Sequence, residues 1–304
     1  MNLVKRIKNA VIKFTYQNKM AKIKDYIHLM RVRQWYKNLV VFLAIFFSGN
    51  LLEIEPFVTT IFAFFSLALI SSSNYIINDL KDKEKDKLNP EKMNRPLASG
   101  NISKTKAIRL MVVLLTLGII VSLSVSREFF YLAAALFCGS QIYTFFLKEI
   151  PFADILTISS LFVIRSISGA VAIEVYVSPW LILCPFFLSL FLSVGKRQAE
   201  VLLLKKVAIK TRKVLHDYNN GLTNSLMIVS TTLLIISYAL YSFLSENPGL
   251  IYTLPIGLFL IFKYFHLVSE GSIISRHPEK IVKNKQMMVG IIIWTIVTTM
   301  IIYY

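Results

Sequence analysis

The chain has 304 residues, of which 55% are hydrophobic, and carries 34 Lys and Arg against 17 Asp and Glu. Soluble domains are about 45–50% apolar, and nearly uncharged runs recur along this whole chain, so a soluble globular protein is excluded. The net charge of +17 is confined to alternate segments between the apolar runs. That distribution excludes nucleic-acid binding as its explanation.

The predicted elements are one surface segment and a series of membrane spans. Residues 1–24 are basic, with apolar residues at helical spacing, which predicts an amphipathic segment on the membrane surface; a disordered basic tail is the alternative. A transmembrane helix needs about 20 apolar residues. Nine such runs predict one transmembrane domain over 25–304, with spans near 36–52, 57–77, 106–125, 129–147, 153–173, 179–195, 223–245, 250–267 and 287–304.

The charges between the spans predict the topology. Lys and Arg gather before Asn38 and within 78–109, 196–213 and 263–285, whereas the alternate connections hold mostly acids. Positive residues stay on the cytoplasmic side, so we expect the amino terminus in the cytoplasm and the carboxyl terminus outside. The two longest inner connections, 78–105 and 196–222, predict a site on the cytoplasmic face of the cell membrane.

The most informative local pattern follows the second span and reads NDLKDKEKD from Asn78 to Asp86. At about 100° per residue, Asp79, Asp82 and Asp86 fall on one face of a helix. Hard oxygen ligands of this kind suit Mg²⁺, and the pattern does not distinguish Mg²⁺ from Mn²⁺. The alternative is a solvated helix end in which lysines alternate with acids.

A second pattern, NRPLASG, begins at Asn94. Its Arg95 lies between a turn and the next helix, where a guanidinium can grip a phosphate in bidentate fashion. Together the two patterns resemble NDxxDxxxD and RPLxxG, the signature of the UbiA-type prenyltransferase superfamily. The resemblance implies an all-α bundle of nine transmembrane helices, a cavity on the cytoplasmic side, and Mg²⁺ holding a pyrophosphate.

Further patterns favour one branch of that superfamily. The second aspartate-rich motif expected after the sixth span is replaced by GKRQAE, which begins at Gly195. RQWYKN at 33–38, YTFFLK at 143–148 and Arg165 inside a span complete a set that resembles the decaprenyl-phosphate phosphoribosyltransferase branch. One departure is Asn284-Lys285, where an acidic residue is expected before the basic one. The resemblance implies transfer of 5-phosphoribose from phosphoribosyl pyrophosphate to a polyprenyl phosphate, with inversion at the anomeric carbon, for envelope polysaccharide precursors.

The resemblance also implies roles for individual residues. Asp79, Asp82 and Asp86 would hold the metal, with Asn78 steering them. Arg95 and Lys148 would bind the ribose donor, and Lys196 and Arg197 one of the phosphates, with Glu200 orienting Lys196. Arg165 is open to two interpretations, a contact with the lipid phosphate or a structural pairing with another helix. The full set of predicted substrate-binding residues is Lys37, Arg95, Tyr143, Lys148, Arg165, Lys196, Arg197, Glu200 and Tyr264.

Two other functions remain open. The first is a prenyltransferase that joins a prenyl diphosphate to an aromatic or other small acceptor; the missing second aspartate motif argues against it. The second is a transporter or lipid-binding membrane protein, which would leave the three aligned carboxylates unexplained. The expected partners are phosphoribosyl pyrophosphate, polyprenyl phosphate and membrane lipids, and self-association of the chain stays open.

Overall fold

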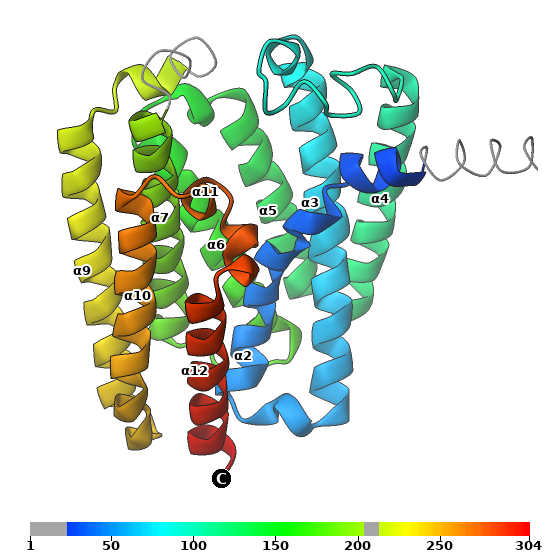
Figure 1. Ribbon diagram of the computed structural model, residues 1–304. Helices are drawn as coiled ribbons and strands as arrows, with labels where there is room; N and C mark the ends of the chain where they lie inside the picture. Colours follow the sequence, from blue (N-terminus) through cyan, green and yellow to red (C-terminus); the bar gives the residue numbers. More distant parts are fainter. Residues whose placement is uncertain (1–22, 204–212) are drawn as a thin grey trace, which may run out of the picture. The chain divides into compact units, whose positions relative to one another are not determined.

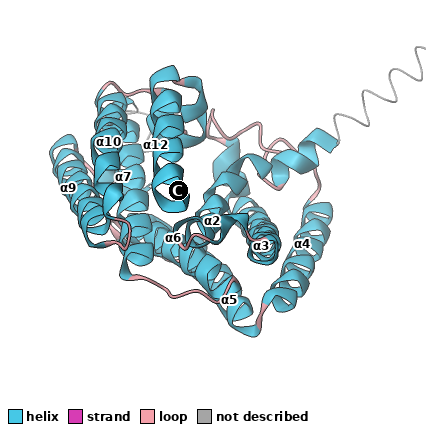
Figure 2. Cartoon of the chain, turned by 90° about the horizontal axis from the view of Figure 1, so that it is seen from below, coloured by secondary structure: helices cyan, strands magenta, loops and turns pink. Residues whose placement is uncertain are grey.

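The computed structural model describes residues 23–203 and 213–304, and every regular element in these ranges is a helix (Figures 1 and 2). The predicted surface segment 1–24 lies almost wholly outside them. Contacts group the chain into two compact units, one of Met1–Trp35 with Ala68–Gly118 and one of Tyr36–Leu67 with Ile119–Tyr304. We call them unit 1 and unit 2.

Seven stretches of helix in the described residues are long and apolar enough to cross a membrane, which makes this a multi-pass membrane protein. They comprise α3 (Ile54–Lys87), α4 (Lys104–Val125), α6 (Ala153–Ala172), α7 (Pro179–Leu203), α9 (Asn220–Leu244), η5 (Pro248–Thr253) joined to α10 (Leu254–Ser269), and α12 (Lys285–Tyr303).

These stretches match seven of the nine predicted spans. Of the other two, 129–147 coincides with α5 (Arg127–Phe145), a helix of 19 residues. The span at 36–52 is divided among η1 (Val32–Val41), α2 (Phe42–Phe47) and η2 (Asn50–Leu52). The count of nine stays a prediction.

Unit 1 consists of a helix at 23–29, the carboxyl-terminal part of α3, the connection 88–103 and most of α4. Its core is formed by apolar side chains from all four: Leu29, Ile76, Leu97, Ile102, Ala107 and Leu114. The 34 residues of α3 span about 51 Å at 1.5 Å per residue, against about 30 Å for the hydrocarbon core. The charged end of α3, from Asp79 to Lys87, therefore extends beyond the apolar part of the helix.

Unit 2 contains α2, α5, α6, α7, α9, α10, α11 (Ile273–Arg276) and α12. Neighbours in space are α5 with α6, α6 with α7, α7 with α9, and α10 with α12; Figure 2 shows α7, α9 and α10 side by side. Side-chain caps define where helices begin: Asn219 Oδ1 accepts from Leu222 N at 2.8 Å, and Asn284 Oδ1 accepts from Met287 N at 3.1 Å. The core of unit 2 includes Ile155, Phe191, Val194, Met227, Leu234, Tyr264, Val268 and Met287.

A close approach inside unit 2 depends on Gly169 of α6. A Cβ at this position would lie 2.0 Å from the carbonyl oxygen of Val41, so only glycine lets α6 reach η1. One turn earlier, Arg165 Nε donates to Asn38 Oδ1 at 2.9 Å and Arg165 Nη1 donates to Leu161 O at 2.8 Å. The two contacts fix η1 against α6.

The far end of α12 is tied to the start of unit 2. The Tyr303 hydroxyl donates to Phe46 O at 2.8 Å and accepts from Leu51 N at 3.2 Å. One side chain thereby satisfies backbone groups at the end of α2 and in η2, where helix termini leave such groups unpaired. We call this contact the Tyr303 clamp.

Candidate functional site

The predicted aspartate motif forms the centre of an ionic cluster in unit 1. Arg95 Nη1 donates to Asp79 Oδ1 at 3.0 Å and to Asp86 Oδ2 at 2.7 Å. Arg31 Nη2 also donates to Asp79 Oδ1, and Lys92 Nζ lies 3.8 Å from Asp86 Oδ1. We call these five residues the aspartate–arginine cluster.

The local sequence explains why these side chains meet. Asp79 and Asp86 are seven residues apart, which places them within about 20° on the face of α3, and both side chains are nearly fully buried. Arg95 reaches them from the connection 88–103, where its backbone N–H donates to Lys92 O at 2.9 Å. Of the three aspartates predicted to share one face of this helix, Asp79 and Asp86 are the two that Arg95 brings together.

The donor set fits a hard divalent cation. Arg95 Nη1 bridges the buried carboxylates of Asp79 and Asp86, so the two carboxylates lie close enough to share one positive group. Carboxylate oxygens are also the ligands that Mg²⁺ prefers. Asp82 and Asn78 lie half-buried on the same part of α3. Within 23–203 and 213–304, no three His, Cys, Asp or Glu side chains are arranged to hold a metal. The three-carboxylate ligand set stays a prediction.

A second ionic cluster lies in unit 2, around Arg197 of α7. Arg197 Nε donates to Asp154 Oδ2 at 2.8 Å, and Nη1 donates to Glu200 Oε2 at 2.5 Å. The Tyr218 hydroxyl donates to Asp154 Oδ1 at 2.8 Å and accepts from Phe152 N at 3.0 Å. We call Arg197, Asp154, Glu200 and Tyr218 the Arg197 network.

Burial gives this network its rigidity. Asp154 is 0% and Arg197 2% exposed, and a buried ion pair persists only when its geometry satisfies both groups. Burial, together with the charge of Asp154, raises the pKa of the Tyr218 hydroxyl, so the phenol stays protonated and donates. Because two protein carboxylates hold Arg197, binding a phosphate would require its guanidinium to leave one of them. Its role as a phosphate ligand, and that of Glu200 as a partner of Lys196, stay predictions.

The other predicted residues of unit 2 lie near the same helix ends. Lys148 is in η3 (Leu147–Glu149), which contacts η4 (Lys213–His216), and Tyr143 is half-buried in the last turns of α5. Lys196 follows Gly195, where a Cβ would lie 3.1 Å from Tyr264 Cε1. The Tyr264 hydroxyl is buried, with no hydrogen-bond partner among the described residues.

The charge of Lys37 acts on Glu279, and Arg165 hydrogen-bonds to another protein residue. In η6 (Pro278–Lys283), Glu279 Oε1 lies 3.3 Å from His277 Nδ1. Burial alone would raise the pKa of Glu279, but hydrogen bonds from His277 and from its own backbone, with the charges of His277 and Lys37, lower it to about 2. Arg165 has the structural pairing described above, with Asn38. Its contact with a lipid phosphate stays a prediction.

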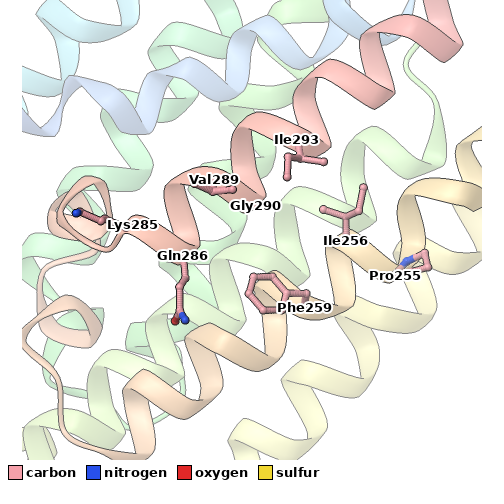
Figure 3. Close-up of a pocket in the computed structure, with 8 residues that line it drawn as sticks. All are labelled: Pro255, Ile256, Phe259, Lys285, Gln286, Val289, Gly290 and Ile293. Atoms are coloured by element: carbon pink, nitrogen blue, oxygen red, sulfur yellow. The ribbon is translucent and has the colours of Figure 1, made fainter.

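An apolar groove opens between α10 and α12 in unit 2 (Figure 3). Its volume is about 580 Å³, and it is lined by Pro255, Ile256, Phe259, Lys285, Gln286, Val289, Gly290 and Ile293. Figure 3 shows Lys285 and Gln286 at one end and Pro255 and Ile293 at the other. The lining suits a hydrocarbon chain.

The sequence predictions did not include Arg31, Lys92, Asp154 or Tyr218 among the site residues. Arg31 stands two positions before the RQWYKN pattern, so its place beside that pattern was the available signal. Asp154 contacts Arg197 of another helix. The bond to Arg197 joins residues 43 positions apart, and no spacing rule predicts such a pair.

Comparison with known proteins identifies the family. The model of the UbiA prenyltransferase family matches residues 38–274. A decaprenyl-phosphate phosphoribosyltransferase of Mycolicibacterium smegmatis is 33% identical over 238 residues, which cover 76% of this chain and 74% of that protein. One from Corynebacterium glutamicum is 32% identical over 221 residues, 71% of this chain and 67% of that protein.

Solved structures show the same fold. A UbiA homolog from Archaeoglobus fulgidus, bound to GPP and Mg²⁺, superposes with a TM-score of 0.71 at 17% identity, over 92% of this chain and 100% of that one. The chain therefore belongs to the UbiA prenyltransferase family, as a multi-pass membrane transferase similar to the decaprenyl-phosphate phosphoribosyltransferases.

Proposed function

We propose that this protein transfers the 5-phosphoribosyl group of phosphoribosyl pyrophosphate to a polyprenyl phosphate and releases pyrophosphate. The observation that carries the proposal is the aspartate–arginine cluster. Its two carboxylates contact three cations, Arg31, Arg95 and Lys92, which suits a metal together with a polyanionic donor. The similarity to decaprenyl-phosphate phosphoribosyltransferases over more than two thirds of the chain supports this choice of substrates.

In the reaction, the bond between the anomeric carbon and the pyrophosphate oxygen breaks, and pyrophosphate leaves with the electron pair. An oxygen of the lipid phosphate forms the new bond from the opposite face, through an oxocarbenium-like ribose. A lipid phosphate is largely ionised near neutral pH, so the protein need not remove a proton from it.

The protein supplies charge and position. Asp79, Asp82 and Asp86, with Asn78, would hold Mg²⁺ or Mn²⁺, which neutralises charge developing on the leaving group. Arg95 and Lys148 bind the donor. Lys196 and Arg197 bind a phosphate, and Lys37, Tyr143, Arg165, Glu200 and Tyr264 complete the contacts with the two substrates.

The proposal includes the finer topology. Nine spans, an amino terminus in the cytoplasm and a surface segment at 1–24 place the chemistry on the cytoplasmic face of the inner membrane, where the water-soluble donor is available. The lipid-linked phosphoribose would serve as a pentose precursor for cell-envelope polysaccharide.

The test follows radiolabelled phosphoribosyl pyrophosphate with purified protein, polyprenyl phosphate and Mg²⁺, and measures label in the lipid phase. We expect metal-dependent labelling that a chelator abolishes and Asp82→Asn lowers about 10²–10³-fold, as for lost electrostatic stabilisation of a transition state. Lys87→Gln is the matched control, because Lys87 also lies on α3 and its ion pair, with Glu84 Oε2 at 2.8 Å, is at the surface.

The competing function is prenyl transfer, favoured by the fold shared with a homolog that was solved with GPP. The same protein is therefore given a labelled prenyl diphosphate and a small aromatic acceptor. Prenylated product without phosphoribosyl labelling of the lipid would refute the proposed function.

A further inference from the structure

Arg31 is the least expected member of the aspartate–arginine cluster. It lies outside the aspartate motif and contributes a second guanidinium to Asp79 Oδ1, the same oxygen that Arg95 contacts. Its side chain is 20% exposed while that of Asp79 is 3% exposed, so Arg31 covers the carboxylate from the more open side. The guanidinium carbon also lies 4.8 Å from the centre of the Tyr75 ring, which adds a cation–π contact.

The backbone at Arg31 would suit a different residue. Its φ is +51°, in the left-handed region that usually follows the end of a helix and that glycine occupies most readily. Arg31 follows the helix at 23–29, and its N–H donates to His28 O at 3.1 Å. Arginine adopts this conformation against a steric penalty, and the ion pair with Asp79 offsets it.

The charges of the cluster restrict how a metal can bind. The five residues of the cluster carry a net charge of +1, which a divalent cation alone would raise to +3. With the carboxylate of Asp82 included, the charge is zero without the metal and +2 with it. A metal at Asp79 would also compete with two guanidinium groups for one oxygen. The cluster therefore favours a metal that arrives with an anion, and a guanidinium that then moves from the carboxylate to that anion.

We propose that Arg31 is an ionic latch on Asp79. Without ligand, its guanidinium holds the carboxylate; when metal and donor bind, Arg31 releases Asp79 and binds an oxygen of the donor's pyrophosphate group. Arg31 is then a substrate-binding residue in the bound state and a competitor of the metal in the free state. This inference rests on the proposed function, since it takes a pyrophosphate-bearing donor as the ligand.

The latch predicts opposite effects of one substitution on two ligands. In Arg31→Gln, Mn²⁺ alone binds more tightly than to wild type, because a competing cation is gone. Pyrophosphate then strengthens Mn²⁺ binding less than in wild type, because its guanidinium partner is gone. Coupling between two ligands is typically 5–150-fold; we expect each change to be about tenfold. Both are measured on purified protein without turnover, from the electron paramagnetic resonance signal of free Mn²⁺, with and without inorganic pyrophosphate. Because pyrophosphate itself binds Mn²⁺, each titration is compared with the same titration without protein.

Three further variants separate the latch from a structural role. Arg31→Gly also removes the guanidinium but suits the positive φ, so it provides the same test should Arg31→Gln fail to fold. Arg31→Lys keeps the positive charge, so pyrophosphate should strengthen Mn²⁺ binding more than in Arg31→Gln but less than in wild type. Lys87→Gln removes a surface charge from α3, the helix that carries Asp79 and Asp86, and should leave the binding of Mn²⁺ and of pyrophosphate unchanged.

The outcomes distinguish the latch from the proposed function. If wild type binds Mn²⁺ with pyrophosphate, but Arg31→Gln and Arg31→Gly bind Mn²⁺ alone as wild type does or more weakly, the latch is wrong and the function stands. Wild-type protein that binds no Mn²⁺ even with pyrophosphate would overturn both.

Discussion

Replacing Gly169 by alanine tests the packing that holds η1 in place. The new Cβ would lie 2.0 Å from Val41 O and 2.9 Å from Val41 C. Ordinary contacts begin at 3.4 Å, so the backbones of α6 and η1 must separate by about 3.4 − 2.0 = 1.4 Å. The obstructing atom is a backbone carbonyl and cannot rotate away, as a side chain could.

The expected loss of stability follows from three contributions. Overpacking costs about 1–3 kcal/mol, and loosening the nearby hydrogen bond between Arg165 and Asn38 costs about 1.5–3 kcal/mol. The better helix propensity of alanine returns about 1 kcal/mol. We therefore expect Gly169→Ala to lower the free energy of unfolding by about 3 kcal/mol, which for a chain of this length corresponds to a midpoint lower by about 5 °C.

The assay is unfolding of purified protein in mixed micelles by increasing SDS, followed by circular dichroism, together with the thermal midpoint. Gly139→Ala is the matched control: it also lies in unit 2, but its Cβ would meet only Leu161 Cδ2, at 2.9 Å, the tip of a flexible side chain. We expect that control to change stability by less than about 1 kcal/mol. Equal midpoints for the two variants would refute the assigned contact between Gly169 and Val41.

Three further predictions test the remaining contacts. Asp154→Asn leaves Arg197 buried with one carboxylate fewer, and we expect it to lower the free energy of unfolding by about 3 kcal/mol. Tyr218→Phe removes one hydrogen bond to Asp154 and should lower it by about 1 kcal/mol. A lower thermal midpoint for Tyr218→Phe than for Asp154→Asn would contradict the Arg197 network. For Glu279, a folded-state pKa of about 2 lies below its unfolded value, so the carboxylate stabilises the fold above about pH 4.5. This contribution is lost as the pH falls toward 2, so the midpoints of wild type and Glu279→Gln should converge in acid; a constant difference across that range would be inconsistent with the lowered pKa. Finally, Asp79→Asn should weaken Mn²⁺ binding more than Asp82→Asn, because Asp79 is buried in the cluster while Asp82 is half-buried. Equal Mn²⁺ affinities of the two variants, measured by electron paramagnetic resonance, would argue against this prediction.

The helical fold and the aspartate face of α3 could be predicted from the sequence because both depend on local spacing. Long apolar runs define the spans, and a seven-residue interval puts Asp79 and Asp86 on one side of a helix whatever surrounds it. The conformation of the first span was harder to predict. The residues at 36–52 are hydrophobic, but this pattern does not indicate that η1, a 3₁₀ helix, replaces a regular α-helix beside Gly169.

The partners of the charged side chains could not be predicted in the same way. Arg95 is predicted to bind a phosphate, and nothing in the sequence indicates that its side chain also bridges two carboxylates. Asp154 likewise contacts Arg197 on another helix. Such pairs depend on which helix faces meet, and that is decided by packing at residues such as Gly169 rather than by the charged residues themselves.

The Tyr303 clamp has a consequence for how unit 2 is assembled during synthesis. Its hydrogen bond joins residues 257 positions apart, and the ribosome delivers α12 after every other helix of the unit. Until then, the carbonyl of Phe46 and the N–H of Leu51 must rely on other partners at the end of an already inserted segment. Closure of unit 2 is thus a late step, and a tag or truncation that disturbs Tyr303 would act on membrane assembly before it acted on catalysis.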